Sequence, residues 1–138
     1  MPILHLVDHE NRTVFARIVG DIPTGDVIDN LRRLGTSSQV PDHYNMLIDL
    51  RYSATVRSYA EGRSIIQAWS FAANKYAKKC VFLASESTGF GAVRMTTTLA
   101  EIAGYDAHAA HSEEEACQLL GLSNLPTDEQ FNQNGFEV

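Results

Sequence analysis

The chain has 138 residues, 44% of them hydrophobic and 20% charged, and its 11 Lys and Arg against 17 Asp and Glu give a formal charge of -6. This composition is typical of one folded domain and excludes a disordered or collagen-like chain, while the acidic balance without a basic run argues against nucleic acid as a partner. Short apolar runs and an amino terminus without a secretory signal predict a cytoplasmic protein with no membrane span.

The amino-terminal half of the chain predicts two strands, a helix and a third strand. Apolar residues alternate over residues 3–9 and 13–20, and the three residues between them are about the length of a hairpin connection, so these strands should be antiparallel. A helical pattern opens at Thr24, which can cap it, and Gly35 should end it. The run 44–50 is apolar enough to be a central strand.

Helices and strands alternate in the second half. A capping-box pattern at Ser58 and Glu61 opens a helix that carries Trp69 on its apolar face, where we interpret the indole as core. The elements expected after it are a strand over 79–84, a helix ended by Gly104, a strand over 105–111 and a helix from Ser112 to Gly121. This order predicts an α/β fold: a mixed, mainly parallel sheet of about five strands, with an antiparallel first strand at or near an edge and about four helices.

The domain organisation follows from a change in composition near residue 122. Residues 1–122 form the predicted single domain, whereas residues 123–138 contain no Lys or Arg, three acids and a cluster of Asn and Gln. We interpret this segment as a polar, acidic tail. Phe131 and Phe136 can dock it on the domain or on a second copy of the chain, and the second alternative favours a homodimer.

The cysteines and histidines lack the spacing of a metal site. Cys80 and Cys117 have no CxxC neighbour and are interpreted as small buried hydrophobes. His5 and His9 share a strand face but would lie about 13 Å apart at ~3.3 Å per residue. The motifs of common hydrolases are also missing. We therefore expect no metal, no cofactor and no enzymatic activity.

Ligands of parallel sheets bind beyond the carboxyl ends of the strands, and two loops of this chain qualify, 49–58 and 85–94. The second places small residues before a helix, where bare amides and glycines suit an anion, namely Ser87, Thr88, Gly89 and Gly91. The same glycines also suit close packing between strand and helix.

Arg94 falls near the start of that helix, where a cation opposes the helix dipole and needs compensation. One alternative is an ion pair with Glu86 or Asp49. The other is a bound anion shared with Arg51 or Arg57, which would place three arginines around one mouth.

Several segments together resemble a known family. They are the strand pair ending in Gly20, the strand 46–50 with its loop to Ser58, and the segments 90–95 and 112–120. Over residues 3–122 the chain resembles small bacterial SpoIIAA-like proteins of the STAS group, which share the fold of anti-sigma-factor antagonists and of sulfate-transporter carboxyl-terminal domains. The last two segments resemble single-domain members that overlap with proteins described as Sec14-type lipid binders.

The resemblance implies a candidate modification site. The antagonists carry an Asp-Ser-Ser-Gly segment at the start of the helix after the central strand, and a partner kinase phosphorylates its first serine. This segment falls on residues 57–60, where Ser58 matches the serine while Arg57, Tyr59 and Ala60 depart from the pattern. A serine that caps a helix also needs no further function.

Two functional hypotheses follow. The first is a regulatory module of the STAS type that contacts a protein partner, or a second copy, near the helix that begins at Ser58. The second is a binding domain for a small anionic or lipid-like ligand, with Arg51, Arg57, Arg94, Gly89 and Gly91 around its mouth.

Overall fold

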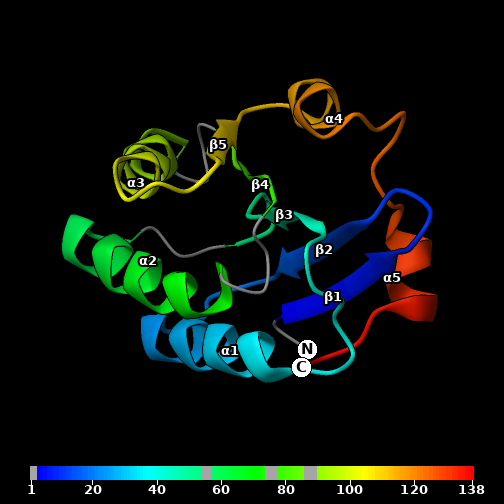
Figure 1. The fold of residues 1–138 in the computed structure, drawn as a ribbon, viewed down its shortest axis with the longest axis horizontal. Coiled ribbons are helices and arrows are strands. Elements are labelled where there is room, and N and C mark those ends of the chain that lie inside the picture. Colours follow the sequence, from blue (N-terminus) through cyan, green and yellow to red (C-terminus); the bar gives the residue numbers. More distant parts are fainter. Residues whose placement is uncertain (1–2, 54–56, 74–77, 86–89) are drawn as a thin grey trace.

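The computed structural model describes residues 3–53, 57–73, 78–85 and 90–138. Their strands form one five-stranded sheet (Figure 1). The strands lie side by side in chain order, β1 (Ile3–Asp8), β2 (Thr13–Ile18), β3 (Asn45–Asp49), β4 (Cys80–Leu83) and β5 (Ala107–Ala110). β1 is antiparallel to β2, and every later neighbour is parallel. The predicted α/β fold with its antiparallel first strand at an edge is confirmed.

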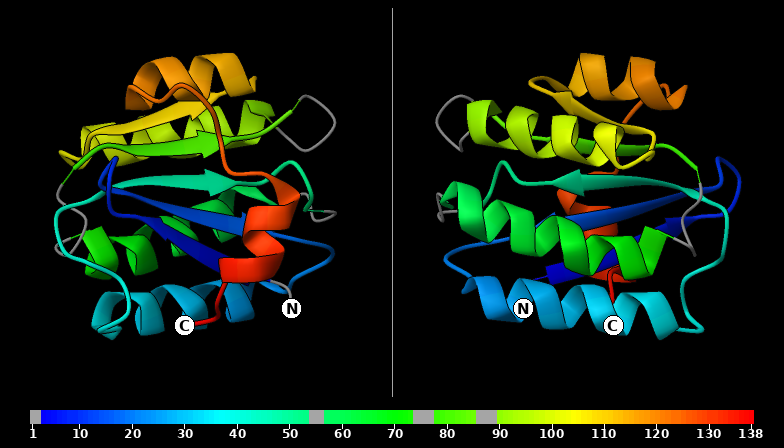
Figure 2. Two further views of the ribbon diagram at one scale, coloured as in Figure 1. Left: turned by 90° about the vertical axis from the view of Figure 1, so that its right-hand side faces the viewer. Right: turned by 60° about the vertical axis from the view of Figure 1, so that its left-hand side comes forward.

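Helices cover both faces of the sheet and give three layers (Figure 2). The helices of one face are α1 (Thr24–Thr36), α2 (Tyr59–Ala73) and α3 (Phe90–Ile102). Those of the other face are α4 (Glu113–Leu120) and α5 (Asp128–Asn134). The described residues thus form five helices, one more than expected. Among them no helix is long and apolar enough to reach across a bilayer.

Strand alternation decides which side chains enter each layer, because successive residues of a strand point to opposite faces. In β2, Val14, Ala16 and Ile18 join the core under α1, α2 and α3. Phe15 joins the second core, under α4 and α5. The central strands are therefore apolar on both faces, as a parallel sheet between two helix layers requires.

The ends of α1 differ from the sequence prediction. Thr24 was expected to cap this helix, but it lies inside the first turn, and Pro23 precedes the helix without a side-chain cap. The Thr24 hydroxyl is instead directed to Glu61 of α2. The helix also passes Gly35 and ends at Thr36, because the chain becomes extended at Ser37.

The predicted caps of two other helices are present, with one change of partner. Ser58 and Glu61 form the reciprocal capping box that begins α2. At α4 the Ser112 hydroxyl accepts from the Glu115 amide, but the Glu115 carboxylate contacts the backbone of His111. The left-handed Gly121 then ends α4, as predicted.

The carboxyl-terminal segment is folded against its own domain. Within residues 123–138, Thr127 and Gln130 form a capping box that begins α5, and Phe131 is buried. Phe136 exchanges two backbone hydrogen bonds with His5, of 2.8 and 2.9 Å, on the outer edge of β1. Both phenylalanines that could have reached a second copy are therefore packed within the chain.

Candidate functional site

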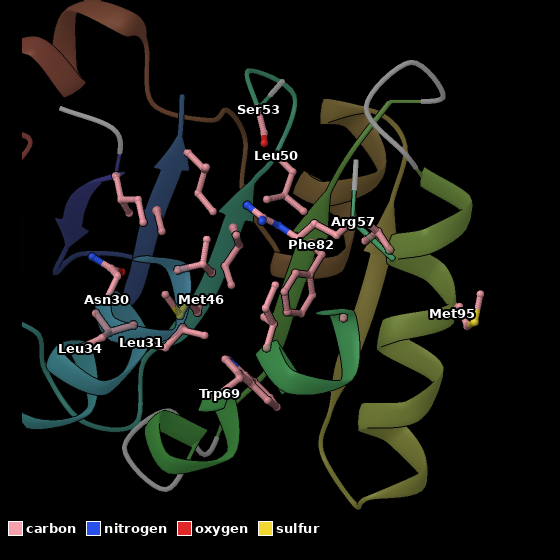
Figure 3. Close-up of a pocket in the computed structure, with 18 of the residues that line it drawn as sticks. Asn30, Leu31, Leu34, Met46, Leu50, Ser53, Arg57, Trp69, Phe82 and Met95 are labelled. Carbon is pink, nitrogen blue, oxygen red and sulfur yellow. The ribbon is translucent and has the colours of Figure 1, made fainter. Parts of the chain in front are cut away.

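A cavity of about 140 Å³ lies between the sheet and the layer of α1 and α2 (Figure 3). Its walls are mainly apolar and come from four strands and from the helices above them. Among the lining side chains are Ile18, Leu31, Leu34, Met46, Ile48, Ile65 and Phe82. A cavity of about 150 Å³ with such walls holds a benzene-sized molecule, so this one has room for about six carbon atoms.

The cavity reaches solvent at the start of α2. Ser58 and Tyr59 line it there, and Tyr59 is 53% exposed. In Figure 3, Arg57 and Ser53 lie at this end of the cavity, and Trp69 lies at the other. Ser53, Arg57 and the first turn of α2 therefore form the mouth, at the carboxyl end of the sheet where ligands of parallel sheets bind.

Arg57 is a half-buried cation at this mouth. Its two terminal nitrogens donate to the Ile22 carbonyl and to the Thr24 hydroxyl, each at 2.9 Å. Burial lowers the pKa of Arg57, while the carboxylates of Glu61 and Asp21 act in the opposite direction. Because an arginine side chain in a protein keeps its proton, these contacts hold a fixed positive charge beside apolar walls.

Ser58 and Glu61 form a network of hydrogen bonds at the mouth. The Ser58 amide donates to Glu61 Oε1 at 3.1 Å, and the Glu61 amide donates to Ser58 Oγ at 3.2 Å. The Thr24 hydroxyl donates to the second oxygen of the same carboxylate, so the start of α1 is bonded to the start of α2. These hydrogen bonds, that from Thr24 first, lower the pKa of Glu61.

Two aromatic side chains with polar nitrogens line the interior. His5 is 1% exposed and Trp69 is 2% exposed. Neither ring nitrogen of His5, nor Trp69 Nε1, makes a hydrogen bond of ordinary length and angle among the described residues. Burial lowers the pKa of His5 to about 4, and a weak hydrogen bond between its ring and the Phe136 backbone opposes this shift only in part.

Trp69 has the core position predicted for it, with edge-on contacts to Tyr105 and Phe82 at centroid distances of 4.9 and 6.4 Å. No motif of the sequence marks His5 as a cavity residue. The signal that could have located it is a polar ring two residues after Ile3, on a strand face that is otherwise apolar.

The structure does not bring the other two arginines of the proposed anion site, Arg51 and Arg94, to this cavity. Arg51 donates to both oxygens of Asp49, at 3.0 and 2.8 Å, and to Glu113 of α4 at 2.7 Å, and the hydrogen bond to Asp49 raises its pKa. Arg94 lies exposed on α3. Of the three arginines, Arg57 is the one that lines the cavity.

The glycine-rich loop is only partly placed. Gly91 lies inside the first turn of α3, which begins at Phe90, and so does not precede the helix as expected. Ser87, Thr88 and Gly89 fall outside the described residues, as does Glu86, one of the two acidic partners considered for Arg94. The other, Asp49, is bonded to Arg51.

A second polar cluster lies on the opposite face of the sheet. Arg17 Nη1 contacts Asp128 of α5 at 2.6 Å, and its Nε lies 3.9 Å from Asp49. The guanidinium also stacks on Tyr52 and Phe131, with its carbon 4.7 and 4.2 Å from the ring centroids. Because the cluster pairs its cations with acids of the same chain, we assign it to the attachment of α5.

Cysteines and histidines do not gather into a metal site in the part of the chain that the structure describes, where no three His, Cys, Asp or Glu side chains converge. Cys80 is buried, which raises the pKa of its thiol, as predicted for a core residue. Cys117 is only half-buried, so its interpretation as a core residue holds in part.

No protein-family model matches the chain, and no curated protein matches it significantly. The resemblance to the STAS group therefore stays a prediction from the sequence.

Proposed function

We propose that this protein is a binding module for a compact amphiphilic anion, whose apolar part fills the cavity between the sheet and α1 and α2. The observation that carries the proposal is the position of Arg57, a cation fixed at the mouth of an apolar cavity. This is the second of the two hypotheses from the sequence, with one arginine in place of three.

The cavity walls support an apolar chain as the inner part of the ligand. Burying such a chain removes its surface from water, which stabilises the complex by about 25 cal/mol per Å². The lining runs from Ile3 on β1 to Phe82 on β4, three strand spacings or roughly 14 Å across the sheet. A small volume spread over this width favours a narrow, extended chain over a fused ring system.

The polar end of the ligand follows from Arg57. A guanidinium carries five N–H donors in a planar fork that matches a carboxylate or a phosphate, and its contacts with Ile22 and Thr24 fix its position before a ligand arrives. Glu61 lies close by, so an anion must approach from the side of Arg57 away from that carboxylate.

The test is calorimetric titration with heptanoate and with heptan-1-ol, the uncharged alcohol of equal chain length. We expect heptanoate to bind more tightly, and Arg57→Gln to weaken its binding about tenfold or more, since hydrogen bonds to charged groups contribute about 1.5–3 kcal/mol. Arg32→Gln, which removes an exposed arginine from the outer side of α1, is the matched control and should bind like the wild type. Equal binding of heptanoate by both variants, or equal affinity of the wild type for heptanoate and heptan-1-ol, would refute the proposal.

A second proposal keeps the STAS-type module, in which a protein partner contacts the start of α2. Its support is Tyr59, an aromatic side chain exposed beside Ser58 at the mouth. Phosphorylation of Ser58 would set a phosphate at a helix amino terminus, which is favourable, but next to the Glu61 carboxylate that caps it, which is not.

This second proposal is tested by affinity purification with Tyr59→Ser and, as a control, Ile102→Ser, which removes a still more exposed apolar side chain at the end of α3, 78% exposed against 53% for Tyr59. A specific partner should be lost with Tyr59→Ser and with Ser58→Asp, and retained with Ile102→Ser. Loss with all three variants, or with none, would argue against a contact at α2.

A further inference from the structure

The interior of the cavity carries a polar group that an apolar chain leaves without a partner. His5 projects from β1 into the cavity lining and is almost completely buried, yet neither of its ring nitrogens makes a well-formed hydrogen bond among the described residues, its contact with the Phe136 backbone included. Buried polar groups in folded proteins nearly always have a partner. An unpaired imidazole facing a cavity therefore indicates a ligand that supplies one.

The protonation state of His5 defines what that partner must be. With a pKa lowered to about 4 by burial, the ring is neutral at pH 7. A neutral imidazole offers one N–H donor and one acceptor nitrogen. A hydroxyl group can hydrogen-bond to either nitrogen, because it donates one hydrogen bond and accepts two.

His5 and Arg57 line the same cavity, and β1, which carries His5, is the neighbour of β2. His5 is paired with Ala16, which lies two residues, or roughly 7 Å, back along β2 from Ile18, and one strand spacing of roughly 5 Å to the side. Arg57 is bonded to the Ile22 carbonyl, four residues after the end of β2. Trp69, the other cavity residue with an unpartnered nitrogen, lies eleven residues along α2 from Ser58, roughly 16 Å at 1.5 Å per residue, and its indole can only donate a hydrogen bond.

Resting on the proposed function, we infer that the cavity selects amphiphilic anions that carry a hydroxyl at the inner end of the chain, where it bonds to His5. The ligand class is thus a short hydroxy acid, with its carboxylate at Arg57 and its hydroxyl at β1. A ligand that ends in a methyl group fills the same space but leaves the imidazole unpaired. Sites built around buried polar groups reject such analogues strongly, because the unmet hydrogen bond is lost in full.

The test compares 6-hydroxyhexanoate with heptanoate, two acids with the same number of non-hydrogen atoms that differ in a terminal hydroxyl or methyl. By calorimetry we expect the wild type to bind the hydroxy acid about tenfold more tightly. The ¹⁵N chemical shifts of the His5 ring should move with the hydroxy acid and much less with heptanoate. His5→Phe should reverse the preference, and His5→Leu provides a second variant if the larger ring disturbs the fold.

The outcomes separate this inference from the proposed function. If both acids bind equally and their binding depends on Arg57, the cavity binds anions but His5 does not select them, and the inference is wrong. Retention of the preference in a folded His5 variant would also overturn it. If neither acid binds, the proposed function fails as well.

Discussion

Asp49 is a charged residue that is almost completely enclosed, with 3% of its surface exposed. It ends β3 with its side chain on the face of α4 and α5, where it accepts two hydrogen bonds from the Arg51 side chain and one from the Arg51 amide. Arg17 lies on its other side, at 3.9 Å, and is itself buried. Removing one member of such a cluster leaves a buried charge without compensation, which costs more than the pair contributes in water.

We therefore expect Asp49→Asn to lower the free energy of unfolding by about 3 kcal/mol, near the lower end for broken buried pairs because Asp128 still contacts Arg17. Glu113→Gln is the matched control, since Glu113 pairs with Arg51 at the exposed end of the cluster and should cost less than about 1 kcal/mol. Urea unfolding of both variants measures the difference. Equal losses would mean that the cluster is open to solvent.

At the scale of the elements, α5 is a short polar helix that depends on one side chain. Phe131 is its buried residue, and it packs against the second core and under the Arg17 guanidinium. The segment after α5 then pairs with β1 through Phe136 and covers the edge of the sheet. An uncovered edge strand is a site for pairing with other chains, so this segment also protects the protein from association.

Phe131→Ala should therefore cost about 3–5 kcal/mol in the free energy of unfolding, the range for removing a large buried aromatic side chain. It should also speed amide hydrogen exchange at His5, whose backbone bonds to Phe136 depend on the same attachment. Asn132→Ala, one residue further on the exposed side of α5, should stay within about 0.5 kcal/mol of the wild type. Normal exchange at His5 in the Phe131 variant would show that residues 135–138 dock independently.

The elements that sequence reasoning predicted are those with a strong local signal. Apolar alternation located β1 and β2, and the spacing of Ser58 and Glu61 located the start of α2. The helix α5 was missed because it has one apolar residue, although Thr127 and Gln130 carry the same capping-box spacing. The polar composition of residues 123–138 suggested a tail, although the spacing of Thr127 and Gln130 predicts a helix cap.

The candidate site was harder to predict because it depends on contacts between distant parts of the chain. Arg51 and Arg57 fall within the predicted loop 49–58, so the sequence predicts that both lie at one mouth. In the structure Arg51 turns to Asp49 on the face of α4, whereas Arg57 turns to the start of α1. The isolation of His5 likewise follows from packing around β1, which no local pattern describes.

The whole molecule is a sheet between two unequal layers. The layer of α4 and α5 holds the cluster of paired charges, whereas the layer of α1, α2 and α3 holds the cavity, with His5 at one edge of the sheet. Burying a neutral histidine makes the stability of the entire fold depend on pH. The unfolded chain binds a proton on this ring near pH 6.5, while the folded chain resists it until about pH 4.

Between these two pH values the unfolded state binds more protons, so the free energy of unfolding must fall as the pH decreases and level off above about pH 7. For a pKa that moves from 6.5 to about 4, the loss from pH 7.5 to pH 4.5 is about 2.5 kcal/mol. Urea unfolding at both values should show this loss in the wild type on top of the titration of the carboxylates. His5→Phe should lack that part of it, whereas His9→Gln, which changes an exposed ring, should follow the wild type. If the free energies of unfolding of His5→Phe and His9→Gln depend on pH alike, the imidazole of His5 takes up its proton in the folded protein as easily as in the unfolded chain. Water would then have to reach the interior at β1.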